Sequence, residues 1–261
     1  MKNSEYVRIV QNIHEFGGMD MSKVVQYQMS IFGDYDNIRP EQDILIEFIR
    51  NQALQGFLPS AFNISTINPI TGEVMQRPGL QMIQQASGWN ITVVPDRIDV
   101  NYQLQPGRHI FSVIDDLTEQ ARAFLTATLE ILSVGGKRLT INCRVEIEQS
   151  SYERSERFRS RITKFLDYYN DCKVPEWNIS FAGNRLMQVA GKTEKVNEIT
   201  NVMCIPLPED KASISVMFDV NTIQHNMRER FDLHNMNEFF AYAKSKITQL
   251  QKVIVDEWER A

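Results

Sequence analysis

The chain repeats its own pattern at a constant offset of 116 residues. The strand-like segment 98–102, with the sequence IDVNY, is matched 116 positions later by ISVMF at 214–218. Each is followed by apolar residues at steps of three and four, in 116–134 and in the segment that begins at Asp232. This spacing is typical of an amphipathic helix. The sequence therefore predicts two similar halves, each ending in a strand and a helix.

The first half is predicted to contain a strand, a helix, four strands and a final helix. Segment 23–31 alternates apolar and polar residues, the period of a half-buried strand. Pro40 begins a helix that extends to about Leu54. Segment 61–103 has four strand-like runs separated by turn residues. Gly135-Gly136 is expected to end the final helix.

The second half is predicted to follow the same order. A strand at 139–147 is followed by a helix at about 152–169, and the last helix begins near Asp232, its expected N-cap. The four strands expected between these helices are 177–180, 185–190, 198–205 and 213–220.

This order of elements resembles the TATA-binding-protein-like (TBP-like) fold. The resemblance implies an α+β protein of two tandem β-α-β4-α repeats, with a curved antiparallel sheet and helices packed on one face. We expect an N-terminal arm at 1–22, a first repeat at 23–136 and a second repeat at 137–261.

Short motifs carry a second resemblance. Segment 97–102 (RIDVNY), segment 218–221 (FDVN) and Phe239-Phe240 are similar to those of a sporadically distributed bacterial family of uncharacterised proteins of similar length. That family has no established activity, so the resemblance supports the fold and implies no reaction.

Charge, hydropathy and cysteine spacing argue against several classes of protein. The formal net charge of −5 opposes a general nucleic-acid binder, which usually carries a basic excess. No run reaches the ~18 apolar residues of a membrane-spanning helix, and segment 1–16 has no signal-peptide pattern. Cys143, Cys172 and Cys204 have unrelated spacings and predict no disulfide framework. We therefore expect a cytoplasmic protein that does not enter a membrane.

The motifs of catalysis and metal binding are not found. The four histidines lack the spacing of metal ligands, and no Cys-x-x-Cys, His-Glu-x-x-His or Gly-x-Ser-x-Gly motif occurs. The sequence therefore predicts no catalytic residue, no metal and no cofactor. An enzyme of unrecognised type remains an alternative.

The polar side of the predicted strands is the first candidate binding surface. It is rich in amide and hydroxyl side chains, and we select Arg97, Asn101, Asn142 and Arg144 as its ligand or partner residues. A sheet face that is only solvated is the competing interpretation. The leading hypothesis is a non-enzymatic binding or adaptor module. It would hold a protein partner or polar small molecule on this face or in a groove between the repeats. A homo-oligomer is left open.

A basic helix is the second candidate surface. Arg154, Arg157, Arg161 and Lys164 are spaced by three, four and three residues, so they share one helix face. An exposed, solvated face is the favoured interpretation. The alternative is an anionic partner, with the protein acting as a nucleic-acid-binding saddle that the net charge disfavours.

Overall fold

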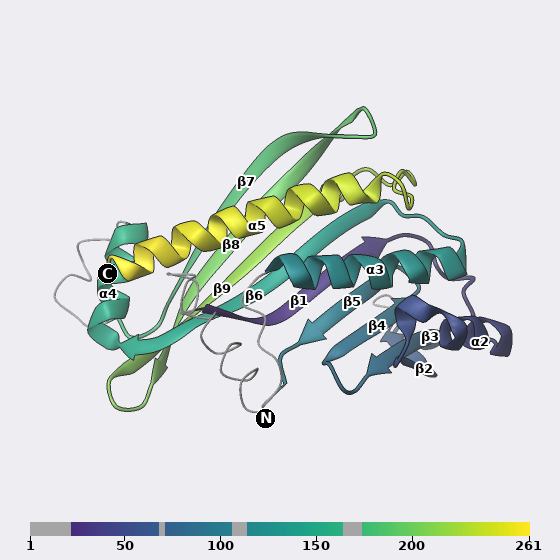
Figure 1. Ribbon diagram of the computed structural model, residues 1–261, viewed down its shortest axis with the longest axis horizontal. Coiled ribbons are helices and arrows are strands. Elements are labelled where there is room, and N and C mark those ends of the chain that lie inside the picture. The colour runs from purple at the N-terminus through teal and green to yellow at the C-terminus, as the bar shows by residue number, and fades with distance from the viewer. Residues whose placement is uncertain (1–21, 68–70, 106–113, 164–173) are drawn as a thin grey trace, which may run out of the picture.

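The computed structural model describes residues 22–67, 71–105, 114–163 and 174–261 (Figure 1). The expected arm at 1–22, apart from Ser22, lies outside the described residues, as do Lys164 and Cys172.

A nine-stranded sheet, in which every neighbouring pair is antiparallel, contains strands from both halves of the chain. In spatial order the strands are β2 (Leu58–Ile67), β3 (Val74–Gln84), β4 (Trp89–Val94), β5 (Arg97–Gln103), β1 (Ser22–Phe32), β6 (Arg138–Ser151), β9 (Lys211–Thr222), β8 (Lys192–Leu207) and β7 (Trp177–Val189). The sheet is open, with β2 and β7 at its ends. The predicted α+β class and antiparallel sheet are confirmed.

Two long helices lie across one face of the sheet (Figure 1). The described helices are α2 (Gln42–Arg50), the 3-10 helix η2 (Gln52–Leu54), α3 (Ile114–Leu132), α4 (Tyr152–Ile162) and α5 (Met236–Glu259). On β1, the buried Tyr27 hydroxyl donates to Thr118 Oγ1 of α3 at 3.1 Å, which fixes the side of β1 that faces the helices. None of the described helices is both long and apolar enough to cross a membrane.

The centre of the sheet carries the 116-residue offset in its strand pairing. Tyr27 on β1 pairs with Cys143 on β6, and these two positions are themselves 116 apart. Tyr27 also pairs with Tyr102 on β5, while Cys143 pairs with Phe218 on β9. The pairing of β1 with β5 therefore has the same register as the pairing of β6 with β9.

The second half has three strands between its helices, not the four that the sequence predicted. The expected strands 177–180 and 185–190 form one strand, β7, which pairs with β8 along its whole length. The chain turns only at Ala190 and Gly191, where φ is 49° and 73°, the positive values of a two-residue hairpin turn. The residues around Gly183 remain extended because Gly183 pairs with Glu198 without any shift of register.

The glycine pair after α3 packs two segments together and does not end the helix. α3 ends at Leu132, followed by Ser133 at a φ of 53°. A Cβ at Gly135 would lie 2.6 Å from the Phe231 carbonyl oxygen, and one at Gly136 would overlap Ile31 Cγ1. The two glycines are needed because β1 and the segment before α5 approach the backbone here.

Asp232 does not cap α5. That helix begins at Met236 with Asn235 at its N-cap. Asp232 Oδ1 accepts hydrogen bonds from the backbone N–H groups of His234 and Asn235, both at 2.9 Å. It therefore stabilises the turn that precedes the helix, a role open to any Asp near a helix start.

Candidate functional site

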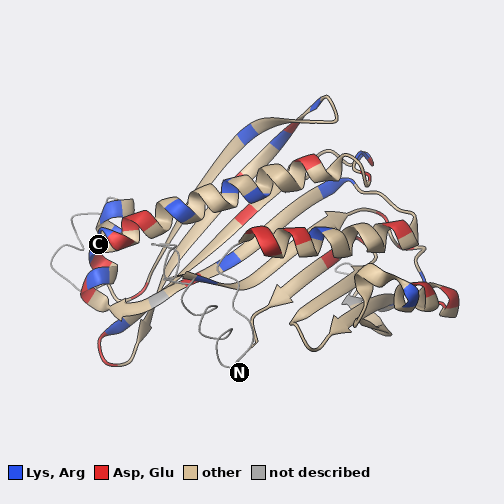
Figure 2. Cartoon of the chain, viewed as in Figure 1, with Lys and Arg blue, Asp and Glu red and all other residues tan. Residues whose placement is uncertain are grey.

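The face of the sheet opposite α3 and α5, here called the open face, is lined by amides and hydroxyls. Charged residues are concentrated on the helices, and the strands carry fewer of them (Figure 2). Strand pairing places five of its polar side chains in one line, the central row: Asn90, Asn101, Gln28, Asn142 and Asp219. Neighbours in this row come from strands about 4.8 Å apart, a distance that side-chain hydrogen bonds can bridge.

A second line of polar residues, the adjacent row, runs beside the first. It contains Thr92, Asp99, Ser30, Thr140 and Asn221. At β9, where the two rows end, the polar side chains are hydrogen-bonded to one another. Asp219 Oδ1 accepts hydrogen bonds from Thr140 Oγ1 at 3.1 Å and from Asn221 Nδ2 at 2.9 Å.

The middle of the adjacent row contains two buried polar atoms without a partner. Asp99 is 4% exposed and Ser30 is 1% exposed, and the two residues are paired across β5 and β1. Asp99 Oδ2 accepts a hydrogen bond from Arg97 Nε at 2.8 Å. Neither Asp99 Oδ1 nor Ser30 Oγ makes a hydrogen bond with the part of the chain that the structure describes. A buried polar atom left this way costs about 1–3 kcal/mol, so a water or a ligand is expected there.

Two predicted site residues, Asn101 and Asn142, are brought together on either side of Gln28 in the central row. Asn101 Nδ2 donates to Asn90 Oδ1 at 3.1 Å, which extends the row onto β4. The pair therefore belongs to one hydrogen-bonding surface that runs from β4 across β5 and β1 to β6 and so includes strands of both halves.

The two predicted arginines lie on the same face but on opposite sides of the central row. Asp99 holds the pKa of the Arg97 guanidinium above its ordinary value by its negative charge. Arg144 pairs with Gln26, and its Nε donates to Ser215 Oγ at 2.9 Å. Arg97 therefore borders the unpartnered pair directly, whereas Arg144 is engaged with β9.

A hollow of about 260 Å³ opens beside the central row at the β3–β4 hairpin. It has no charged lining residue, and its lining consists of Gln81, Ile83, Gln84, Gln85, Gly88, Trp89, Asn90, Gln103 and Gln105. The sequence interpretation missed these glutamines. The available signal was compositional, because six glutamines lie between residues 76 and 105.

The arginines of α4 contact the end of α5. The Arg154 guanidinium lies 4.7 Å from the centre of the Trp258 ring and donates to the Trp258 carbonyl oxygen at 3.0 Å. Arg161 Nε lies 2.8 Å from Glu257 Oε2. Cations at the last turn of a helix oppose the negative end of its dipole, so both contacts stabilise α5.

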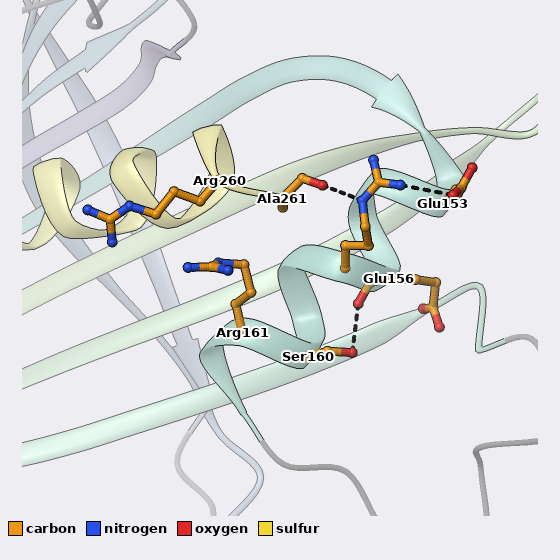
Figure 3. Close-up of a pocket in the computed structure, with 7 residues that line it drawn as sticks. Glu153, Glu156, Ser160, Arg161, Arg260 and Ala261 are labelled. Carbon is orange, nitrogen blue, oxygen red and sulfur yellow. Dashed lines mark hydrogen bonds and ion pairs between the residues drawn. The ribbon is translucent and has the colours of Figure 1, made fainter.

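A pocket of about 420 Å³ lies where α4 meets the end of α5 (Figure 3). Arg157 stands at its edge, where Nε donates to the Ala261 main-chain oxygen and a terminal nitrogen lies 2.9 Å from Glu153 Oε1. The full lining is Glu153, Glu156, Arg157, Ser160, Arg161, Arg260 and Ala261. The face shared by Arg154, Arg157 and Arg161 is therefore partly occupied by α5 instead of being fully solvated.

Within the described ranges, no three His, Cys, Asp or Glu side chains are grouped in a way that could hold a metal ion.

Comparison with known proteins finds little similarity. No family model matches the chain, and no curated protein matches it. Among solved structures, the crystal structure of the di-domain ARO/CYC BexL from the BE-7585A biosynthetic pathway aligns with 92% of this chain and 99% of its own. The identity is 10% and the TM-score is 0.21. A likeness at this level carries no inference about activity.

Proposed function

We propose that this protein is a non-enzymatic binding module that holds a polar ligand or a protein partner on the open face. The observation that carries the proposal is the unpartnered pair, Asp99 Oδ1 and Ser30 Oγ, in the middle of a surface of amides and hydroxyls. A carboxylate oxygen accepts hydrogen bonds only, and a hydroxyl both donates and accepts. The bound group is therefore one that supplies an N–H or O–H donor to Asp99, while the Ser30 hydroxyl can either donate to it or accept from it.

The residues around Asp99 and Ser30 indicate which kind of ligand would bind. The central row presents amide groups, which pair with other amides and with hydroxyls, and the adjoining hollow has no charged lining residue. A neutral amide-bearing or hydroxyl-bearing molecule, such as a peptide segment or a polyol, matches this surface. Because Coulomb attraction contributes little, its affinity should change little with salt.

The proposal also covers how the two halves of the fold are related to each other. The two halves are tandem TBP-like repeats on a curved sheet, the second repeat having one strand fewer than the first. The chain is related to the sporadically distributed bacterial family that its motifs resemble. The equal registers of β1 with β5 and of β6 with β9 support the repeat. The open face then corresponds to the sheet surface that such a saddle presents to a partner.

A nucleic-acid-binding saddle receives no support from α4. Arg154, Arg157 and Arg161 each make contacts within the chain, to α5 or to Glu153. Such a saddle would lose affinity steeply with added salt, which distinguishes it from the neutral ligand proposed above.

Thermal-shift assays with two matched variants test the proposal. Short neutral peptides, polyols, sugars and oligonucleotides are screened for a rise in Tm of the wild-type protein, at low and at physiological salt. In the variant Asp99→Asn the remaining oxygen is expected to keep the hydrogen bond from Arg97, so an NH2 donor replaces the unpartnered acceptor. Asp219→Asn changes a carboxylate on the same face whose Oδ1 is already bonded. A neutral compound that stabilises the wild type and D219N, but not D99N, is expected.

Two results would count against this function. One is a neutral compound that stabilises D99N as strongly as the wild type. The other is a stabilising effect of oligonucleotides alone that disappears with salt, which would favour the saddle alternative instead.

A further inference from the structure

β7 ends the sheet with its outer edge unpaired. Along Trp177–Val189 it pairs with β8 on one side, and no strand of the described ranges pairs with the other side (Figure 1). In an antiparallel strand, alternate residues direct their N–H and C=O groups to each side. The outer edge of β7 therefore presents a row of main-chain donors and acceptors suited to another strand.

β7 lacks the features that usually prevent edge-to-edge pairing. It has no proline, and its register with β8 runs without a bulge. Its one charged residue, Arg185, is engaged by Glu198 Oε2 at 2.8 Å. By contrast, β2 at the opposite end of the sheet contains Pro59. Natural edges are commonly protected by proline, bulges or free charges, so β7 is the unprotected end of this sheet.

The middle of β7 is also exposed and partly apolar. All residues from 180 to 186 are exposed. Phe181 is 43% exposed and Leu186 is 72% exposed, although both belong to a regular strand. An exposed edge with large apolar side chains is the kind of strand that pairs with another chain.

We propose that β7 pairs antiparallel with β7 of a second copy of this chain, joining two nine-stranded sheets into one. A twofold pairing centred on Gly183 would place Phe181 opposite Arg185 of the second copy, a suitable cation–π pair. On the same side it would place Ile179 opposite Met187 of the second copy. No like charges face each other in this register, because Arg185 is the one charge on the strand.

Charge-swap variants at Ala182 and Asn184 test this pairing. In the proposed register these residues face each other across the twofold axis, and their neighbours on β8 are the uncharged Ile199 and Asn197. The variant A182K/N184K opposes Lys with Lys, which destabilises cross-strand pairs. The variant A182E/N184E opposes Glu with Glu. Each should fold normally because both positions are exposed.

Sedimentation equilibrium of the full chain measures the outcome. We expect a wild-type dimer, a dissociation constant about tenfold or more higher for each charged variant alone, and a heterodimer when the two variants are mixed. The control N63K/S65K places the same charges at exposed positions of β2 and should leave the dimer unchanged. Amide exchange in β7 should also slow as the wild-type concentration rises.

A wild-type chain that is monomeric at about 100 μM, well above the dissociation constants of stable dimers, would overturn the proposal. So would a dimer that the β7 substitutions do not weaken, or one that the β2 substitutions weaken equally. None of these outcomes bears on ligand binding at Asp99, so the two proposals can fail separately.

Discussion

Glu194 on β8 and Arg230 before α5 form an ion pair whose side chains are only 9% and 8% exposed. Two nitrogens of Arg230 contact the two carboxylate oxygens, at 2.8 and 3.2 Å. Arg230 also donates to the Asn226 carbonyl oxygen at 2.8 Å and so ties the loop before α5 to the sheet.

Glu194→Ala should lower the free energy of unfolding by about 3 kcal/mol, because it leaves the Arg230 guanidinium buried without its counter-ion. Urea unfolding measures the change. Lys211→Ala is the matched control, since its pair with Glu209 is exposed and its removal should cost less than about 1 kcal/mol. Equal losses in the two variants would contradict the role given to burial.

Cys143 lies at the centre of the sheet, fully enclosed between β1 and β9. Burial raises the pKa of its thiol well above the usual range. Because the thiolate is the reactive form, Cys143 should stay unmodified by iodoacetamide at pH 8 in the native protein and react once unfolded in guanidinium. Peptide mapping by mass spectrometry reads the result. Labelling of native Cys143 within minutes would show that the centre of the sheet opens readily.

At the scale of elements, α4 holds the end of α5 through Arg154 and Trp258. Arg154→Ala removes the stacking on the indole ring and a donor to the last turn of α5, so we expect a loss of about 1–2 kcal/mol. Lys252→Ala removes an exposed pair within α5 and should cost less than about 0.5 kcal/mol. Unfolding midpoints in urea compare the two. If Arg154→Ala were neutral, the contact of Arg154 with Trp258 would not be what holds the end of α5.

Most helices and strands could be predicted because the residue patterns that indicate them are local in the sequence. The alternation of β1 and the three-and-four spacing in α3 and α5 depend on residues that are close in the sequence. The prediction of a strand break between residues 180 and 185 was wrong because pairing with β8 keeps β7 extended through these residues. Gly135 and Gly136 misled the prediction of the helix end for a related reason, since their role depends on Phe231 and Ile31, far away in the sequence.

At the scale of the whole molecule, the candidate site depends on register. Alternation along each strand places Asp99 and Ser30 on the polar side, but only the pairing of β5 with β1 places them side by side. A shift of one residue would have moved either side chain to the opposite face. The glutamine-lined hollow similarly requires β3, β4 and the end of β5 to be adjacent. The boundary expected at 136/137 stays a prediction.

One continuous sheet and one buried core that includes residues of both halves predict cooperative unfolding of the whole chain. The three tryptophans allow this to be measured. W89F leaves Trp177 and Trp258 to report on the second half, and W177F/W258F leaves Trp89 to report on the first. In each background, the guanidinium midpoint from fluorescence should coincide with that from circular dichroism.

Gly136→Ala perturbs the seam between the halves. The new methyl group would overlap Ile31 Cγ1 and press on the Phe32 carbonyl oxygen, while Gly136 itself is paired with Phe231. We expect both tryptophan reporters to lose the same stability, about 1–3 kcal/mol, because overpacking at one joint is felt by the entire cooperative unit. Gly72→Ala is the control, since a methyl group there meets no atom within 4 Å and only its positive φ opposes it. If the two reporters unfolded at different guanidinium concentrations, or if Gly136→Ala shifted only one of them, the halves would be separate folding domains that share a sheet.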